Sequence, residues 1–292
     1  MSIAEQRYRD LQSLARDSGR TTQELLTLYV LESFLCRVAQ SSMRQRLILK
    51  GGVLLAAFDA RRPTRDIDFS ALNMNNDAQY ALTVCSEIAS QIHEDGVVFD
   101  LMSVSAETIR DDDEYGGVRV SMTAELHTAK ISFHIDLNFA DPIVPAPKEI
   151  AITRILGGSS QIILLGYPIS MVLAEKIVTA IQRGTANTRW RDFGDIYNLS
   201  RRHSISSREL LMSLNKVAEH RVVDLSALGG VLSGYPEIGQ NKYGNWRRKD
   251  DRHELPESFG DLLESVCTFT DPIILEGSSK ETHWDPVNVV WR

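Results

Sequence analysis

The sequence has little cysteine and no long apolar run, and it has no excess of basic charge. Only three of its 292 residues are cysteine, and Cys36, Cys85 and Cys267 lie far apart, without metal-binding spacing. Such a set gives no disulfide framework, so we expect a protein of the reducing cytoplasm. No apolar run is as long as a membrane span, and the charged N-terminus lacks a signal-peptide core. We therefore expect no membrane partner.

The net charge of −7 argues against a protein that is basic throughout, but it leaves room for a local basic patch. With 43% hydrophobic and 24% charged residues, the composition is typical of a soluble globular protein. The length fits one large or two modest domains. The pattern becomes helical near residue 165, so we predict an α/β core lobe with N-terminal helices over 1–165 and a helical C-terminal lobe over 166–292.

The stretch from Lys50 to Ser70 carries the strongest pattern in the chain. It opens with Gly51 and Gly52, and the apolar run 53–58 that follows is long enough to start a buried helix. Glycine lets backbone approach a ligand closely, and a helix beginning after the pair would point N–H groups at an anion. The adjoining Lys50 is the best candidate cation here, which makes this segment a candidate nucleotide-binding site.

A short strand predicted at 65–69 brings two carboxylates together. Strand side chains alternate between faces, so Asp66 and Asp68 share one face. Paired carboxylates repel unless a cation lies between them, and they suit Mg²⁺, which prefers oxygen ligands. The glycine pair, the helix and the two aspartates together predict a site for a metal–nucleoside triphosphate.

A third carboxylate lies on the cleanest strand of the sequence, 130–139. Its odd-numbered residues from Ile131 are apolar, and the alternate positions hold His134 and Asp136. If this strand lies beside 65–69, Asp136 completes a three-carboxylate cluster; an exposed aspartate on a sheet face is the alternative. His134 is a poor candidate ligand, because Mg²⁺ prefers oxygen.

The segments LKGG and TRDIDF resemble the opening signature of the polymerase-β-like nucleotidyltransferase superfamily. More narrowly, they resemble the AbiEii/AbiGii toxins of abortive-infection and toxin–antitoxin systems, including the MenT-type toxins. The resemblance spans about residues 45 to 200. It implies a nucleotidyltransferase core with a mixed sheet, and Mg²⁺, with Mn²⁺ as a substitute, held by Asp66, Asp68 and Asp136. Asp136 is also a candidate base for the attacking hydroxyl.

A second motif lies after residue 166, on a helix predicted at 168–184 and another starting near 189. Lys176-x-x-x-Ala followed by Arg-Asp192-x-x-Asp resembles the second half of the toxin signature. The resemblance implies that Lys176 contacts the triphosphate and that Asp192 orients the triphosphate or the lysine. A salt bridge between two helices is the structural alternative.

Thr64 stands two residues before Asp66, where the turn becomes the strand. A role in strand entry is the plain interpretation. Some toxins of the family that this stretch resembles carry a serine here that the antitoxin phosphorylates, so Thr64 is a candidate regulatory phosphorylation site. A phosphate would add negative charge beside the two carboxylates.

Two further stretches bear on partners. Arginines crowd one region, at positions 183, 189, 191, 201 and 202, and segment 240–253 mixes aromatic rings with cations. We expect a surface loop at 240–253, with an RNA-binding segment as the alternative. The acidic run 111–114 indicates a solvated hairpin connection rather than a metal site.

The other periodicities predict the remaining elements. Helices are expected at 3–17, 22–38, 78–93, within 205–232 and after 257, and strands at 97–104 and 118–126, with a strand pair within 153–165.

The family resemblance implies a growth-arresting toxin that transfers a nucleotide from an NTP to an RNA acceptor, a tRNA 3′ end, and releases pyrophosphate. A cognate antitoxin is the implied protein partner, and we expect a monomer. Two alternatives stay open: an enzyme that modifies a small molecule, as aminoglycoside nucleotidyltransferases do, and a non-catalytic interaction protein on the same fold.

Overall fold

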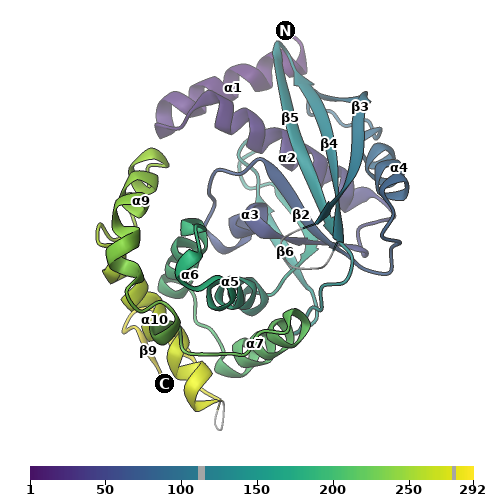
Figure 1. Ribbon diagram of the computed structural model, residues 1–292. Coiled ribbons are helices and arrows are strands. Elements are labelled where there is room, and N and C mark those ends of the chain that lie inside the picture. Colours follow the sequence, from purple (N-terminus) through teal and green to yellow (C-terminus); the bar gives the residue numbers. More distant parts are fainter. Residues whose placement is uncertain (111–115, 278–280) are drawn as a thin grey trace. The chain divides into compact units, whose positions relative to one another are not determined.

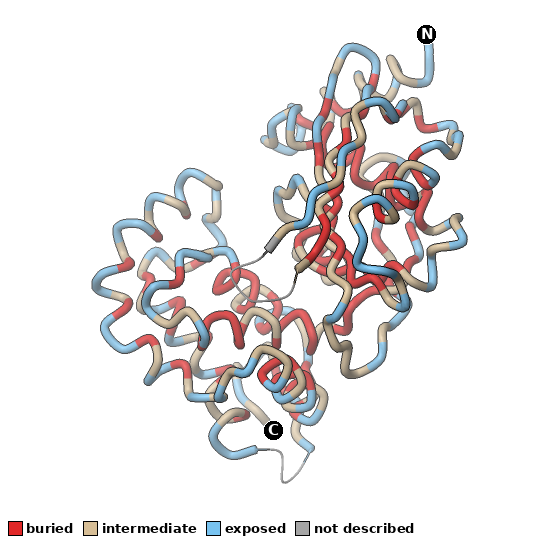
Figure 2. Tube along the Cα trace, turned by 45° about the vertical axis from the view of Figure 1, so that its right-hand side comes forward, coloured by how far each residue is buried: buried red, intermediate tan, exposed pale blue. Residues whose placement is uncertain are grey.

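A computed structural model describes residues 1–110, 116–277 and 281–292 (Figure 1). The chain forms two compact units, Met1–Asp141 with Pro147–Tyr167, and Pro142–Ala146 with Pro168–Arg292. Each unit has its own concentration of buried residues (Figure 2). The sequence indicated one division near residue 165. In the structure, the chain passes from the first unit to the second between Tyr167 and Pro168. Residues 142–146 also belong to the second unit, which the sequence did not indicate.

The first unit is built on a seven-stranded mixed sheet in the order β3-β4-β5-β2-β1-β7-β6. The pairs β2–β5 and β1–β7 are parallel, and the other pairs are antiparallel. The strands are β1 Leu47–Lys50, β2 Asp66–Ala71, β3 Val97–Arg110, β4 Gly116–Leu126, β5 Ala129–Asn138, β6 Lys148–Thr153 and β7 Gln161–Gly166. The predicted α/β class with a mixed sheet is confirmed.

Helices α1 Ile3–Ser18, α2 Thr22–Gln40 and α4 Ala78–Ala89 belong to this unit. Thr21 caps the N-terminus of α2, because its side chain accepts a hydrogen bond from the Glu24 amide. On the apolar face of the sheet, the ring of Phe34 on α2 lies 5.9 Å from that of Phe99 and 6.0 Å from that of Phe133. Because side chains alternate, the polar positions of β5 lie on the face opposite α2.

The segment between the glycine pair and Asp66 differs from the expected buried helix. The helix begins at the glycines themselves, as α3 Gly51–Leu54, and continues as one 3₁₀ turn, η1 Leu55–Phe58. Asp59 then takes a left-handed conformation that ends the turn. A helix this short only links β1 to the loop before β2.

The second unit is helical. Its elements are α5 Ile169–Arg183, η2 Gly184–Ala186, α6 Trp190–Arg202, α7 Ser207–Arg221, α8 Leu228–Val231, α9 Tyr235–Lys249, α10 Phe259–Glu276, β8 Trp284–Asp285 and β9 Val290–Trp291. The predicted helical character after residue 166 is therefore confirmed, and the C-terminal segment adds a small hairpin of β8 and β9.

The prediction of a surface loop at 240–253 is wrong over most of this segment, because α9 runs to Lys249. Tyr243 and Arg247 are one turn apart and both are buried. The Tyr243 ring stacks on Phe259 with centroids 4.9 Å apart, and Arg247 Nε donates to the Leu255 carbonyl at 2.9 Å. Two residues of the supposed RNA-binding mixture are thus part of the helical core.

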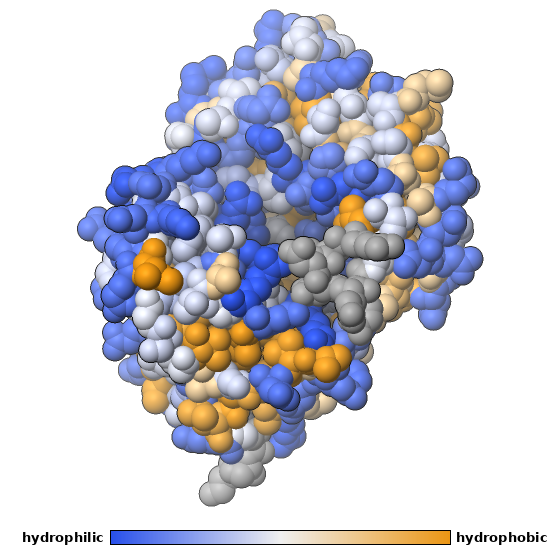
Figure 3. Space-filling view, in the orientation of Figure 1, coloured by the Kyte–Doolittle hydropathy of each residue, from blue (hydrophilic) through white to orange (hydrophobic). Residues whose placement is uncertain are grey.

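The acidic run 111–114 lies outside the described residues. Among the helices that the structure describes, none is long and apolar enough to cross a membrane. Hydrophilic side chains cover most of the surface seen in Figure 3, and apolar residues form small patches among them.

Candidate active site

The strand register of the first unit brings the three predicted aspartates to neighbouring positions. Residue Asp68 on β2 pairs with Asp136 on β5, and Asp66 pairs with His134. Residues paired in register project from the same face, so all three carboxylates lie on the polar side of the sheet. Each is half-buried. Their roles as metal ligands remain a prediction.

The glycine pair allows the backbone to pass over Asp68. A Cβ on Gly51 would lie 1.9 Å from Asp68 Oδ2, and Gly51 has a φ of +66° that favours glycine. The next amide, that of Gly52, donates a hydrogen bond to the Asp68 carboxylate. The glycines therefore hold a catalytic candidate in place, whereas the sequence predicted that they cradle the nucleotide.

The electrostatics around Asp68 favour a bound cation. Burial and the nearby charge of Asp136 raise its pKa to about 6, with a smaller contribution from Asp66, while Lys50 opposes the rise. A carboxylate held among like charges is stabilised when a cation neutralises them. Mg²⁺ commonly uses only one or two protein carboxylates, so Asp66 and Asp68 fit this ion.

Asp136 is also bonded to an arginine on a neighbouring strand. Its two oxygens accept hydrogen bonds from Arg119 on β4, from Nε at 2.8 Å and from Nη2 at 2.7 Å. In the described part of the chain, no three His, Cys, Asp or Glu side chains converge on a point that could hold a metal. The structure thus places the three aspartates together, with one of them bonded to Arg119, and the metal role of Asp136 stays a prediction.

Lys50 forms an ion pair with Asp141, the last residue of the first segment of its unit. Its Nζ lies 2.5 Å from Asp141 Oδ2 and 5.3 Å from the centre of the Tyr167 ring. Lys50 also pairs in register with Asp68 across β1 and β2. The lysine is thus a mostly buried cation at the candidate site, and its contact with a nucleotide remains a prediction.

Thr64 lies against the glycine pair. Its hydroxyl donates to the Asp66 carbonyl at 3.3 Å, and a Cβ on Gly52 would come within 2.9 Å of Thr64 Oγ1. Because the side chain is half-buried, a group added to this oxygen would enter the space beside Gly52 and Asp66.

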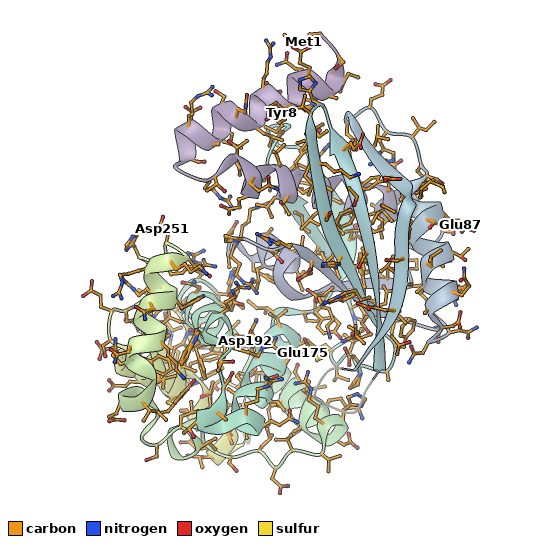
Figure 4. The ribbon with its side chains drawn as sticks, turned by 45° about the horizontal axis from the view of Figure 1, so that its top comes forward. Met1, Tyr8, Glu87, Glu175, Asp192 and Asp251 are labelled. Atoms are coloured by element: carbon orange, nitrogen blue, oxygen red, sulfur yellow. The ribbon has the colours of Figure 1, made fainter. Side chains whose placement is uncertain are left out.

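Asp192, which is labelled in Figure 4, lies in the second unit and forms one charged network with Lys176 of the same unit. Lys176 Nζ donates to Asp192 Oδ1 and to Asp195 Oδ2, both at 2.8 Å. Arg189 Nε donates to the other oxygen of Asp192 at 2.7 Å. Both aspartates are buried, so they fix the position of the lysine head group.

The arginine-rich region is exposed on the second unit at four of its five positions, residues 189, 191, 201 and 202. Arg191 lies 3.7 Å from Asp250, and Arg201 lies over the Tyr197 ring at 5.2 Å. Exposed arginines near both ends of α6 thus add local positive charge to an acidic protein.

Sequence reasoning missed three residues of these clusters as site candidates: Arg119, Asp141 and Asp195. Asp195 could have been identified, because it lies three residues after Asp192 on one helix. The other two could not, since Arg119 meets Asp136 through the β4–β5 register and Asp141 meets Lys50 across 91 residues.

A glycine pair packed against an Asp-x-Asp strand, in a mixed sheet followed by a helical unit, defines a nucleotidyltransferase. A family model described as "Nucleotidyl transferase AbiEii toxin, Type IV TA system" matches residues 33–265. The chain belongs to this family, which confirms the resemblance and makes the protein a nucleotidyltransferase toxin of a type IV toxin–antitoxin system. Membership in such a system implies an antitoxin partner.

Two solved structures are similar to this chain. A crystal structure assigned as a nucleotidyltransferase from H. pylori has a TM-score of 0.47 and 13% identity, and the match covers 85% of this chain and 91% of that one. JHP933 from Helicobacter pylori has a TM-score of 0.36 and 10% identity, with 80% and 97% covered. No curated protein matches the chain.

Proposed function

We propose that the protein transfers a nucleoside monophosphate from an NTP to the 3′ end of an RNA, a tRNA in particular, and so blocks translation. The observation that supports it most is the register pair of Asp68 and Asp136 beside Gly51. The acceptor hydroxyl attacks the α-phosphorus, the bond to the leaving phosphate breaks, and pyrophosphate departs with the displaced electron pair. The proton of the hydroxyl passes to solvent or to a base.

Asp66 and Asp68 would hold Mg²⁺, or Mn²⁺ in its place. When bound, the ion would polarise the α-phosphate and neutralise charge on the leaving group. The backbone at Gly51 keeps Asp68 in place. Lys50, which pairs in register with Asp68, adds positive charge beside it. Lys176 would contact the triphosphate, oriented by the buried pair Asp192 and Asp195.

RNA as the acceptor is supported by the exposed arginines of the second unit. Phosphate contacts release counterions, so binding that depends on them weakens steeply with salt. A small-molecule acceptor would not require these exposed cations.

The experiment is to incubate the protein with total RNA and each α-labelled NTP in turn. We expect label in the tRNA fraction with one preferred NTP, and a transfer rate that falls steeply as salt rises from low to moderate. Label that appears only in a small-molecule fraction, or transfer to RNA that is insensitive to salt, would contradict the RNA assignment.

A further inference from the structure

A histidine lies beside the predicted metal ligands. In the parallel pairing of β2 with β5, His134 stands opposite Asp66, and along β5 it comes two residues before Asp136. Residues paired in register project from one face, and alternate residues of a strand share a face, so the His134 ring lies on the polar side of the sheet with the three carboxylates. The chemistry proposed for the aspartates does not use this ring.

A serine on the next strand fixes the ring. Ser121 on β4 pairs in register with His134, and its Oγ is hydrogen-bonded to His134 Nδ1 at 3.0 Å. A hydroxyl rotates to donate to a ring nitrogen or to accept from one, so this bond suits either tautomer of the imidazole. In the described part of the chain, Nε2 makes no hydrogen bond and is not enclosed. One ring nitrogen is therefore available to a ligand.

The place of the ring in the sheet indicates which substrate it meets. The strand order includes β4-β5-β2-β1, so β1 and the glycine pair that follows it lie on one side of Asp68, and His134 and Ser121 lie on the other. The glycine segment is the candidate nucleotide side. In phosphoryl transfer the attacking and leaving oxygens lie roughly in line, so the acceptor enters from the side opposite the departing pyrophosphate. The β5–β4 side is thus the acceptor side.

The end of an RNA offers a group that matches this nitrogen. Its attacking 3′ hydroxyl has a 2′ hydroxyl on the adjoining carbon, and that hydroxyl is both a donor and an acceptor. Neighbouring strands lie about 4.8 Å apart, so a side chain paired with Asp66 reaches a group adjoining the reacting hydroxyl. At Nε2, one tautomer of His134 offers an N–H and the other a lone pair, and the 2′ hydroxyl can bond to either.

We propose that His134 is a binding residue for the RNA acceptor, and that its Nε2 forms a hydrogen bond with the 2′ hydroxyl of the terminal ribose. Ser121 is the positioning residue of the ring. This inference rests on the proposed function, because it requires that the acceptor is the 3′ end of an RNA. It adds a contact by which the site distinguishes an RNA end from a DNA end.

The test compares two forms of the tRNA that is labelled in the experiment above, one with ribose and one with 2′-deoxyribose at its 3′ terminus. His134→Phe keeps a ring and removes both nitrogens. It should lower kcat/KM for the ribose end about three- to tenfold, as for loss of one neutral hydrogen bond. It should leave kcat/KM for the deoxyribose end unchanged, because that contact is already missing. Any intrinsic effect of the 2′ group on the attacking hydroxyl is common to both proteins and cancels.

Two polar substitutions separate the roles of the ring nitrogens. The amide of glutamine reaches the position of Nε2 and that of asparagine the position of Nδ1, so His134→Gln should keep part of the ribose preference and His134→Asn should lose it. His127→Asn is the matched control, since this histidine lies on the turn between β4 and β5 with its ring 5.5 Å from that of Tyr8. It should keep the wild-type preference. Circular dichroism confirms folding, and His134→Gln serves if His134→Phe does not fold.

Equal losses for the two acceptors in His134→Phe, or no loss for either, would overturn the proposal. NTP affinity should stay at the wild-type value in every variant, and a loss of it in His134→Phe would assign the ring to the nucleotide side and refute the inference. If the wild type labels no RNA, the proposed function fails and this inference fails with it. If it labels both tRNA forms and His134→Phe has the wild-type preference, the inference alone is wrong.

Discussion

At the residue scale, Gly51 has little freedom to change. A Cβ there would overlap Asp68 Oδ2 at 1.9 Å, and the backbone has a φ of +66°. Asp68 would have to move, and its bond from the Gly52 amide would be lost with it. The glycine is therefore required by the carboxylate that it covers.

We predict that Gly51→Ala abolishes nucleotide transfer and lowers the free energy of unfolding by about 1–3 kcal/mol, through backbone strain. Gly158→Ala is the control: its φ is +62°, but a Cβ there meets nothing within 4 Å. It should show similar strain and keep full activity. An active Gly51→Ala protein would contradict this account of the glycine pair.

Thr64 provides a second prediction at this scale. Thr64→Glu, a mimic of phosphorylation, should silence transfer because it places negative charge beside Asp66 and Gly52. Thr64→Val keeps the size and removes the oxygen, so it should retain most of the activity. Both variants are compared at equal melting temperature, and an active Thr64→Glu protein would exclude a charge switch here.

At the element scale, α2 is anchored to the turn before β3 by a buried ion pair. Arg37 Nη1 lies 2.7 Å from Asp95 Oδ2, and Ser33 Oγ donates to the same oxygen at 2.6 Å. Burial alone would raise the pKa of Asp95, but the bonds from Arg37 and Ser33 hold it below its usual value. The pair therefore stabilises the fold wherever Asp95 is ionised.

A depressed pKa fixes the sign of the pH dependence. The contribution of Asp95 is complete above its unfolded pKa of about 3.9 and is lost as pH falls through the lower folded value. We predict that Asp95→Asn lowers the free energy of unfolding at neutral pH by about 3–5 kcal/mol, because Arg37 stays buried without its partner. Urea unfolding measures both effects. Asp10→Asn, in a partly exposed pair with Arg7, should change stability little.

The helices α5 and α6 lead to a prediction about Lys176. Lys176→Met should reduce transfer sharply and raise the apparent KM for NTP. It should also destabilise the fold, because Asp192 and Asp195 lose their shared cation. Adding Asp192→Asn and Asp195→Asn should restore stability without restoring transfer. If the triple variant transfers nucleotide normally, the network is a structural salt bridge and nothing more.

The elements differ in how far the sequence could predict them. Period-two alternation identified β5, because Ile131, Phe133 and Ile135 are all buried on one face of the strand. The same reasoning failed for α9, because its sequence is mostly polar and its buried face is a narrow stripe that includes Tyr243 and Arg247. Packing against Phe259 stabilises this helix, and no local pattern reports that contact.

At the scale of the whole molecule, the candidate site depends on strand order. The sequence predicted three carboxylates on polar faces, and the parallel pairing of β2 with β5 brings Asp66, Asp68 and Asp136 together. The partners of these residues could not be predicted, because each depends on the register of strands distant in sequence. The bond of Arg119 to Asp136 is the clearest case.

The measurement that tests the central claim most directly is nucleotide transfer by Asp66→Ala beside the wild type, under conditions where both are folded. We predict a loss on the order of a hundred- to a thousandfold or more, as for removal of an electrostatic contact to the transition state. The control Glu125→Ala, an exposed acid on β4 of the same sheet, should transfer normally. Transfer by Asp66→Ala at the wild-type rate would contradict the assignment of this site.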